Sequence, residues 1–259
     1  MSETSNFFTA DWPAPEQVHV VTTTRRGGVS MPPYDTFNLA THVGDQPEAV
    51  QQNRARLVAK LSLPSVPLWL TQVHGRDVAT VPGAKEGVEA DAAWTDQPGQ
   101  VLAVLTADCL PVVICDHEGT QLAVVHAGWR GLVEGVLEAA VTKFSAAPEN
   151  LLAWMGPAIG PEAFEVGPEV RHALISAYPA NADAFTPGKG DRWMADIFLL
   201  ARLQLGRLGV SRVFGGGRCT YSDPEHFYSY RRDGRTGRMA TLAWLEQPAW
   251  SSQNQHKET

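Results

Sequence analysis

Three nearly continuous apolar runs most constrain the fold of this chain. They are VLAVLT at 101–106, PVVIC at 111–115 and QLAVVH at 121–126. Such runs are typical of β-strands that are covered on both faces, because a strand with one wet face alternates apolar and polar residues. The chain turns after each run, through AlaAspCys in one case and AlaGlyTrpArgGly in another. The runs therefore predict a buried sheet whose strand ends carry polar side chains.

Further elements are predicted on both sides of these runs. β-branched or alternating segments predict strands at 18–24, 68–74, 77–81, 151–155 and 212–214. Apolar stripes at helical spacing predict helices at about 47–61, 131–144, 168–177 and 195–208. Asp45 and Glu48 form a predicted capping box ahead of the first helix, and Pro47 suits an early helical position.

The end of the chain is interpreted as a β-hairpin. FYSY would run out, MATLAWL would run back, and Asp233–Gly234 would form the turn. No internal repeat or long linker separates the segments, so the 259 residues are expected to form one α/β (α+β) domain with a mixed sheet and flanking helices. Residues 1–16 and the polar tail 248–259 are expected to be peripheral.

Charge and composition narrow the class of partner. The net charge is −7 with no basic face to offset it, which argues against a nucleic-acid or membrane-surface role. The arginines at 231, 232, 235 and 238 are interspersed with Asp233 and are interpreted as a solvated hairpin tip. Three cysteines do not make a disulfide framework, and neither a signal peptide nor a membrane span is visible. A cytoplasmic protein, a monomer or small homo-oligomer, is expected.

His74, Cys109 and His126 are the candidate site residues. Each lies where a short β-like run gives way to turn chemistry, in TQVHG, TADCLP and VHAGWRG. One thiol and two imidazoles could meet at one end of a sheet, and three such ligands with a fourth position open are typical of catalytic zinc. Cys115 and Cys219 are interpreted as structural thiols.

Four other polar residues are candidates for binding or proton transfer. Arg54 falls on the apolar stripe of its helix, so it either pairs with a buried carboxylate or holds an anionic or polar substrate group. Gln72 shares a face with His74, which suggests that this face opens onto a pocket. Asp108 adjoins Cys109, and Arg25 opens a glycine-containing loop.

The blocks that carry these residues resemble the YfiH-like family, also called the laccase-domain or polyphenol-oxidase family. They are TTTRRGGVSMPPYDTFNLATHVGD, Asn53–Arg54, TQVHG, TADCLPV, VHAGWRG, GPAIGP, RCTY and SYRRDGRTGR, which span about residues 20–245. The resemblance implies a layered α/β domain that binds zinc through His74, Cys109 and His126. It also implies phosphorolysis of adenosine, inosine, guanosine and methylthioadenosine, with adenosine deamination as a second activity and copper-dependent phenol oxidation in some accounts.

Physical chemistry ranks these activities. A multicopper laccase needs about four coppers held mainly by imidazoles, and this chain has 8 histidines and no His-X-His pair, so we rank copper below zinc. In deamination Asp108 is a candidate proton carrier. In phosphorolysis Arg54, the Arg25–Gly28 loop or the helix start after Gly128 are candidate phosphate sites, with Asn53 and Gln72 on the substrate side.

Two other classes of function stay open at this point. One is a metal-free amidase or deamidase with Cys109 as nucleophile and His126 as base. The other is a non-catalytic zinc or ligand-binding module, which needs a fourth protein ligand such as Cys219 or His42. The preferred base is also open, because the aromatic residues Tyr34, Phe37 and Tyr228 suit a stacking platform and a core equally well.

Overall fold

Two β-sheets form the centre of the computed structural model, which describes residues 6–246. One sheet has the order β1 (Phe7–Thr9), β2 (Val18–Thr23), β13 (Met239–Leu245) and β5 (Leu102–Thr106). The other has the order β12 (Arg212–Gly215), β8 (Leu151–Met155), β6 (Leu110–Asp116), β7 (Leu122–Ala127), β4 (Ala92–Thr95) and β3 (Val78–Val81). Side chains from both sheets, among them Val104 and Val124, form one apolar core between them.

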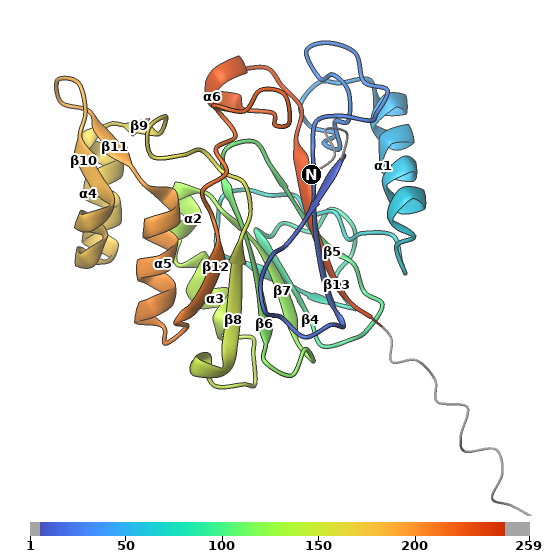
Figure 1. The fold of residues 1–259 in the computed structure, drawn as a ribbon, viewed down its shortest axis with the longest axis horizontal. Coiled ribbons are helices and arrows are strands. Elements are labelled where there is room, and N and C mark those ends of the chain that lie inside the picture. The colour runs from blue at the N-terminus through green and yellow to red at the C-terminus, as the bar shows by residue number, and fades with distance from the viewer. Residues whose placement is uncertain (1–5, 247–259) are drawn as a thin grey trace, which may run out of the picture.

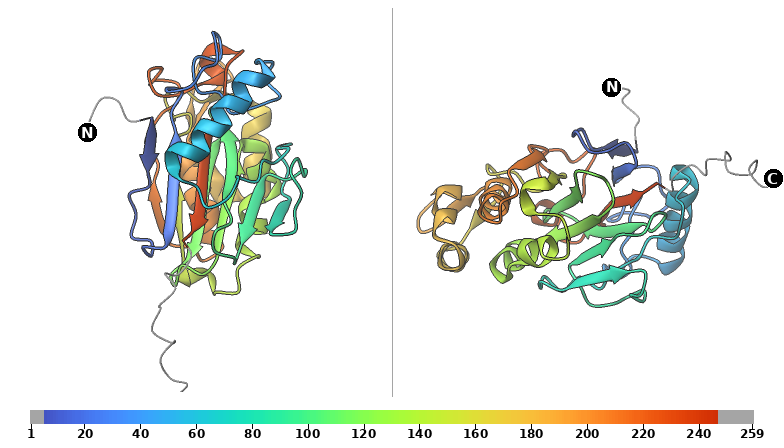
Figure 2. Two further views of the ribbon diagram at one scale, coloured as in Figure 1. Left: turned by 90° about the vertical axis from the view of Figure 1, so that its right-hand side faces the viewer. Right: turned by 90° about the horizontal axis from the view of Figure 1, so that it is seen from below.

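Helices cover the outer faces of both sheets (Figure 1). Helix α1 (Pro47–Leu61) packs on the four-stranded sheet through Leu57. On the six-stranded sheet lie α2 (Trp129–Glu134), α3 (Val136–Val141) and α5 (Ile197–Arg207). The view from below in Figure 2 places α1 at the opposite side of the molecule from α5. The layered, mixed α/β architecture that we predicted is therefore confirmed.

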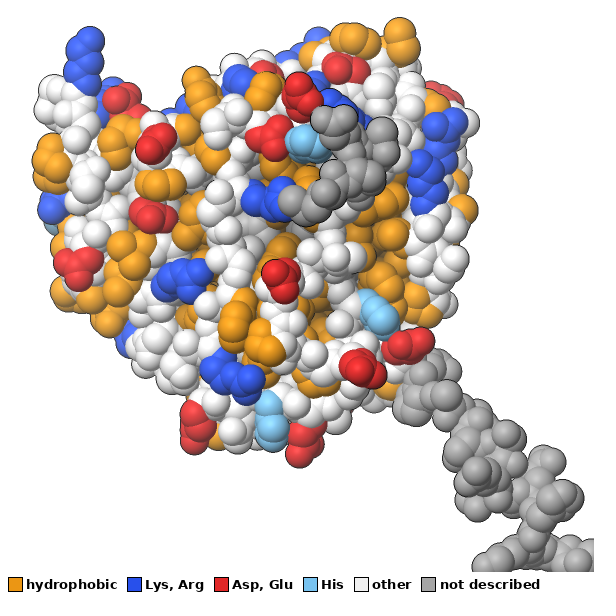
Figure 3. Space-filling model, viewed as in Figure 1, with side chains coloured by type: hydrophobic (Ala, Val, Ile, Leu, Met, Phe, Trp, Pro, Cys, Tyr) orange, Lys and Arg blue, Asp and Glu red, His pale blue; other side chains and the backbone are white. Residues whose placement is uncertain are grey.

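A small outer layer completes the described fold. Strands β10 (Phe185–Pro187), β11 (Trp193–Ala195) and β9 (Glu165–Val166) form a three-stranded sheet beside α4 (Pro168–Ala177). Short helical turns are η1 (Pro148–Asn150), η2 (Pro179–Ala184) and α6 (Tyr230–Asp233). On the face seen in Figure 3, basic and acidic side chains are interspersed. Within residues 6–246, no helix combines the length and the apolar character needed to cross a membrane.

The three apolar runs are strands β5, β6 and β7, and every residue of these strands is buried. Their covering on both faces explains why the sequence lacks polar alternation there. The three runs do not share one sheet as predicted, because β5 belongs to the four-stranded sheet and β6 and β7 to the six-stranded sheet. The six-stranded sheet is mixed: β6 is antiparallel to β7 and β8, whereas β12 is parallel to β8. Because β6 begins at the edge where β7 ends, the turns around Cys109 and His126 lie together.

The predicted carboxy-terminal hairpin is wrong. Residues 230–233 form the short helix α6, and β13 pairs with β2 on one side and β5 on the other, both antiparallel. The residues of β13 are apolar enough for a central strand, and the pairing with β2 and β5 buries almost all of them. The outgoing segment FYSY supplies Phe227 and Tyr228 to the core instead.

Three local predictions also need correction. Residues 68–74 form only isolated bridges, at Leu68 and Thr71, rather than a strand. The predicted helix 131–144 starts at Trp129 and is broken in two at Gly135, whose φ of 83° lies in the left-handed region that glycine tolerates. The first helix has Gln46 as N-cap, and Asp45 instead accepts hydrogen bonds from Ser30 and Asn38.

The segment that we expected to be peripheral at the amino terminus contributes to the fold. β1 pairs antiparallel with β2, and Trp12 packs partly buried against the core between the sheets. The expectation for the polar tail 248–259 falls outside the described residues.

Candidate metal centre

Strand register brings Cys109 and His126 together. Leu110 of β6 pairs with Ala127 of β7, and Pro111 pairs with His126. Extending this ladder by one residue places Cys109 opposite Gly128. A β-carbon on Gly128 would lie 3.0 Å from Cδ2 of His74 and 3.1 Å from Sγ of Cys109. The absence of a side chain at this position therefore lets the thiol approach the backbone of the following turn.

His74 completes the cluster from the irregular segment before β3. Its Nε2 atom lies 3.9 Å from Sγ of Cys109, and its ring centroid is 4.8 Å from that of His126. One ligand atom from each of the three residues lies within 4.8 Å of the others, and this is the single such group among residues 6–246. The backbone of His74 is held at a φ of 63°, the left-handed region that few residues other than glycine adopt. The predicted convergence of the three residues is thus present in the structure.

Asp91 holds both histidines in place, and sequence reasoning missed it. Its carboxylate is fully buried and accepts a hydrogen bond of 2.7 Å from Nδ1 of His126. The same carboxylate accepts backbone N–H groups of Val73, His74 and Gly75. This leaves Nε2 of His126 as the nitrogen that faces the cluster, and it explains the strained turn at His74. A carboxylate behind a ligating imidazole is a common feature of metal sites.

The charges of the cluster shift the pKa values of its members. Burial alone would raise the pKa of Cys109, but the charge and hydrogen bond of His126, together with His74, lower it to about 6. Burial would lower the pKa of His126, but Cys109 and the hydrogen-bonded Asp91 raise it to about 9. The pKa of Asp91 is lowered, since hydrogen bonds and the charge of His126 outweigh burial. Without a bound cation, the cluster therefore favours a thiolate beside an imidazolium.

The donor set fits a single borderline metal ion. Bonds of about 2.0–2.3 Å around a tetrahedral ion imply ligand separations of roughly 3.3–3.6 Å, close to the 3.9 Å between Cys109 and His74. His74 and Cys109 are only half-buried, so the cluster is open on one side. Neither Cys219 nor His42 belongs to the group within the described part of the chain, so the fourth protein ligand of a closed zinc module is not found there. Three ligands with an open side are the pattern of catalytic zinc.

A small apolar cavity of about 130 Å³ adjoins the cluster at Cys109. It is lined by Asp108 and Cys109 on one side and by the aromatic side chains of Trp129, Phe164 and Tyr230. Tyr230 is 61% exposed, which is unusual for a large aromatic side chain. The aromatic residues that we considered as base platforms, Tyr34, Phe37 and Tyr228, are buried in the core and cannot serve as platforms.

Asp108 lines this cavity but is tightly held. One carboxylate oxygen accepts a hydrogen bond of 2.6 Å from the hydroxyl of Thr220, and the other accepts the backbone N–H of Arg231 at 2.7 Å. The residue has a φ of 94°, in a region where only glycine is at ease. The left-handed turn and both hydrogen bonds fix the carboxylate at the wall of the cavity, next to Cys109 in the chain.

Asn53, Gln72 and Arg25 have structural partners. The buried amide of Asn53 accepts from Val29 N–H and donates to Ser30 and to backbone carbonyls. Gln72 pairs with both backbone groups of Leu105, as a neighbouring strand would. All three guanidinium nitrogens of Arg25 donate to oxygens of Asp35 and Pro224. These bonds shape the loops around the site and provide no support for the substrate-binding roles that we predicted.

Arg54 has weaker partners. Its guanidinium stacks over Trp69, with the central carbon 4.1 Å from the ring centroid, and Nε donates to the carbonyl of Leu39. The carboxylate near it is that of Glu86, which is exposed and 3.7 Å away, rather than the buried partner that we considered. An exposed pair at this distance is weak, so the positive charge of Arg54 is largely uncompensated.

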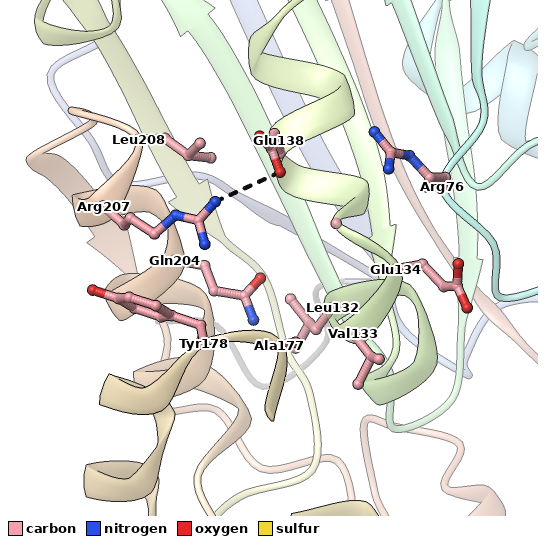
Figure 4. Close-up of a pocket in the computed structure, with 11 residues that line it drawn as sticks. Arg76, Leu132, Val133, Glu134, Glu138, Ala177, Tyr178, Gln204, Arg207 and Leu208 are labelled. Carbon is pink, nitrogen blue, oxygen red and sulfur yellow. Dashed lines mark ion pairs between the residues drawn. The ribbon is translucent and has the colours of Figure 1, made fainter. Parts of the chain in front are cut away.

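A larger cavity lies away from the cluster. It measures about 270 Å³ and lies among α2, α3, α4 and α5, with Arg207 and Glu138 forming an ion pair of 3.8 Å across it (Figure 4). Its lining includes no residue of the cluster and neither cysteine nor histidine. This cavity is larger than the one at Cys109, but the candidate metal ligands His74, Cys109 and His126 lie elsewhere.

Similar proteins of known sequence cover nearly the whole chain. Purine nucleoside phosphorylase YfiH of Shigella flexneri is 54% identical over 242 residues, which are 93% of this chain and 99% of that protein. Purine nucleoside phosphorylase PA4543 of Pseudomonas aeruginosa is 51% identical over 241 residues, 93% of this chain and 98% of that protein.

Solved structures are also similar to this protein over nearly its whole length. Protein NMB0706 of Neisseria meningitidis, at 47% identity, superposes with a TM-score of 0.90 over 94% of this chain and all of that one. YlmD of Geobacillus stearothermophilus, at 29% identity, also superposes with a TM-score of 0.90, over 95% of this chain and 98% of that one. The sequence model of the family described as multi-copper polyphenol oxidoreductase laccase matches residues 19–246. The chain therefore belongs to this laccase-like family, the YfiH family that its motifs resemble.

Proposed function

We propose that this protein is a zinc-dependent purine nucleoside phosphorylase with adenosine deamination as a second activity. The observation that carries the proposal is the convergence of His74, Cys109 and His126 on one open point beside an apolar, aromatic cavity. The names of the relatives, purine nucleoside phosphorylase, support the reaction class. The substrates would be adenosine, inosine, guanosine and methylthioadenosine, with inorganic phosphate.

The donor chemistry supports zinc over copper. One thiolate and two imidazoles suit a borderline ion, and a multicopper centre needs further imidazole ligands that the described residues do not bring to this edge. When bound, zinc would supply a Lewis acid that polarises a substrate oxygen or lowers the pKa of water to about 7. Copper-dependent phenol oxidation is therefore ranked below nucleoside chemistry.

The residues of the chain itself account for binding and proton transfer. The aromatic walls of the cavity, Trp129, Phe164 and Tyr230, would stack on a purine base and exclude water. Asp91 fixes His126 so that only Nε2 faces the reacting groups. Asp108, held by Thr220 and Arg231, would accept or deliver a proton at its carboxylate next to the base.

The test is a product analysis. Zinc-loaded protein is incubated with adenosine, with and without phosphate, and the products are separated by chromatography, with the Cys109→Ala variant as control. Adenine and ribose-1-phosphate that form only with phosphate and are lost in the variant would support phosphorolysis. Inosine formed without phosphate would support deamination. If zinc-loaded protein forms neither adenine with ribose-1-phosphate nor inosine, the proposal is contradicted.

A metal-free amidase is the second candidate, because Cys109 and His126 lie within 4.8 Å of each other as nucleophile and base would. An amidase mechanism of this kind assigns no role to His74. Activity of metal-free protein on an amide, with a covalent adduct on Cys109 detected by mass spectrometry, would favour this candidate over the zinc enzyme.

A further inference from the structure

Arg238 lies at the edge of the metal centre, although its sequence context suggested a solvated hairpin tip. It directly precedes β13, and Met239, the first residue of β13, pairs with Thr106, the last residue of β5. The chain continues from Thr106 into Asp108 and Cys109. Arg238 therefore flanks the turn that carries the thiol, and its side chain is half-buried rather than solvated.

Only one of the three guanidinium nitrogens of Arg238, Nη1, donates hydrogen bonds within residues 6–246. Nη1 donates to the carbonyls of Thr236 and Gly237, which fixes the side chain. Across residues 6–246, no acceptor is found for Nε or Nη2, no carboxylate forms an ion pair with the group, and neither nitrogen is sealed from solvent. The buried hydroxyl of Thr236 in the same loop also lacks a partner within the described part of the chain. A cation that is held in place but unsatisfied is suited to bind an anion.

Arg238 also lies within reach of the other substrate elements. Its guanidinium carbon is 5.8 Å from the ring centroid of Tyr230, which lines the apolar cavity. Burial lowers the pKa of Arg238, while the negative charges of Cys109 and Asp108 raise it, so the three groups interact. The cation therefore lies close to Tyr230 of the aromatic cavity and within range of the charges of Asp108 and Cys109.

Two further basic groups extend this region. Partial burial among its neighbours lowers the pKa of His42, and the positive charges of Arg238 and Arg54 lower this pKa further. Arg54 has only the exposed Glu86 at 3.7 Å to balance it. His42 is therefore uncharged at neutral pH, and Arg238 and Arg54 supply the positive charge of this region, which we call the basic rim.

We propose that Arg238 is the principal ligand of the phosphate that the reaction consumes, with Arg54 adding positive charge at the basic rim. The proposal rests on the phosphorolysis proposed above. The free Nε and Nη2 atoms form a planar fork that matches two phosphate oxygens. A third phosphate oxygen would form the bond to C1′ of the ribose as the bond from C1′ to the base breaks. The bonding electron pair leaves with the base, and the proton of hydrogen phosphate passes to it.

The other phosphate sites suggested by the sequence fit less well. All three guanidinium nitrogens of Arg25 are used within the protein, and Gly28 N–H donates to Thr36. The helix after Gly128 has only 6 residues, so its dipole is small. Among the positions considered, Arg238 alone combines a fixed geometry with free donors next to Cys109.

The kinetic test compares Arg238→Gln and Arg238→Lys with Arg171→Ala. Arg171 is a matched control, because it is a half-buried arginine stacked on Trp193 at 4.0 Å in the outer layer. We expect Arg238→Gln to raise KM for phosphate about tenfold or more, as loss of a charge-assisted hydrogen bond does. KM for adenosine, zinc content and Tm should change little, and Arg238→Lys should give an intermediate KM for phosphate. Unchanged KM for phosphate, or an equal rise in both KM values, would overturn the proposal.

A binding measurement keeps the test independent of activity. Inorganic phosphate is titrated into zinc-loaded protein without nucleoside, and binding is followed by calorimetry or by broadening of the phosphorus NMR signal. Wild type and Arg171→Ala should bind, and Arg238→Gln should bind at least about tenfold more weakly. If this result is obtained but no ribose-1-phosphate forms, the phosphorolysis proposal fails while the anion site stands.

A nucleotide probe separates free phosphate from a phosphate carried by the substrate. Adenosine 5′-monophosphate is titrated alongside adenosine, and free phosphate as the ligand predicts that the nucleotide binds no more tightly than the nucleoside. Tighter binding of the nucleotide that is lost in Arg238→Gln would overturn the assignment of the site to inorganic phosphate.

Discussion

Cys109 and Cys115 lie at the two ends of the same strand and differ in almost every chemical respect. Cys115 is fully buried within β6, in the core between the two sheets, where burial and the charge of Asp116 raise its pKa to about 12. Cys109 lies just before β6, half-exposed beside two histidines, and its pKa is about 6. The residue type is identical, so the surroundings determine whether the thiol stays protonated in the core or ionises near neutral pH.

The difference also shows what the sheet edge provides. Inside the sheet, backbone groups pair with one another and the side chains meet only apolar neighbours. At the edge, β5 and β7 end and β6 begins, and Asp91 holds the 73–75 turn and the ring of His126 through four hydrogen bonds.

The largest expected effect separates the two cysteines directly. Cys109→Ala should abolish stoichiometric zinc binding and lower phosphorolysis by roughly 10³-fold or more, because a ligand of the only proposed metal site is lost. Cys115→Ala should keep both and lose about 1 kcal/mol of stability. Metal analysis, initial rates and thermal unfolding measure these changes. Equal loss of zinc in both variants would contradict the assignment of zinc binding to Cys109 alone of these two cysteines.

Alkylation should distinguish the same pair in metal-free protein. Because the pKa of Cys109 is lowered, its thiolate predominates above pH about 6, so its reaction with iodoacetamide should rise through that pH and then level off. The pKa of Cys115, near 12, keeps that thiol protonated over the same range. Peptide mass spectrometry should give at least about 100-fold slower labelling of Cys115 at pH 7.5. Zinc should protect Cys109, and labelling unaffected by zinc would count against its role as a ligand.

Asp91→Asn tests the hydrogen bonds that position His74 and His126. The amide keeps the size of the side chain but cannot accept all of the hydrogen bonds from His126 and the 73–75 turn. Zinc affinity should fall about 10–100-fold, as it does when the outer partner of a ligating histidine is lost. Competition with a chromophoric chelator measures it. Asp116→Asn, at the opposite end of β6, is the control and should leave zinc affinity unchanged.

The smallest expected effect is at Gly128. An alanine β-carbon would meet His74 at 3.0 Å and Cys109 at 3.1 Å, so these side chains must shift by a few tenths of an ångström. We expect zinc affinity to fall by about threefold, or roughly 0.6 kcal/mol. Gly206→Ala in α5 is the control, since a β-carbon there meets nothing within 4 Å. A tighter site in Gly128→Ala would contradict the close approach.

The three candidate ligands could be predicted from the sequence because Cys109 and His126 lie at the ends of apolar runs that form strands. His74 ends a segment of strand-like alternation, although that segment forms only isolated bridges in the structure. Apolar runs located β5, β6 and β7, and the antiparallel pairing of β6 with β7 brings the turns at Cys109 and His126 to one edge of the six-stranded sheet. Asp91 escaped this reasoning because its partners lie 16–18 and 35 residues away along the chain. The available signal was the acidic Asp91 between the small apolar residues of EADAAW, just before β4, where an unpartnered charge would be costly.

Other features were decided by pairing that local patterns do not encode. MATLAWL is a strand as predicted, but its partners are β2 and β5 rather than the adjacent segment. The same error made Arg238 part of a supposed hairpin tip. Because β13 is central, its first residues lie beside β5 and the metal centre, and Arg238 lies there with them.

Zinc K-edge X-ray absorption of the purified, zinc-loaded protein tests the central claim most directly. The account predicts one zinc per chain with one sulfur at about 2.3 Å and two imidazole nitrogens at about 2.0–2.1 Å. The sulfur signal should vanish in Cys109→Ala and persist in Cys115→Ala. A wild-type spectrum without sulfur, or a sulfur signal that survives in Cys109→Ala, would contradict it.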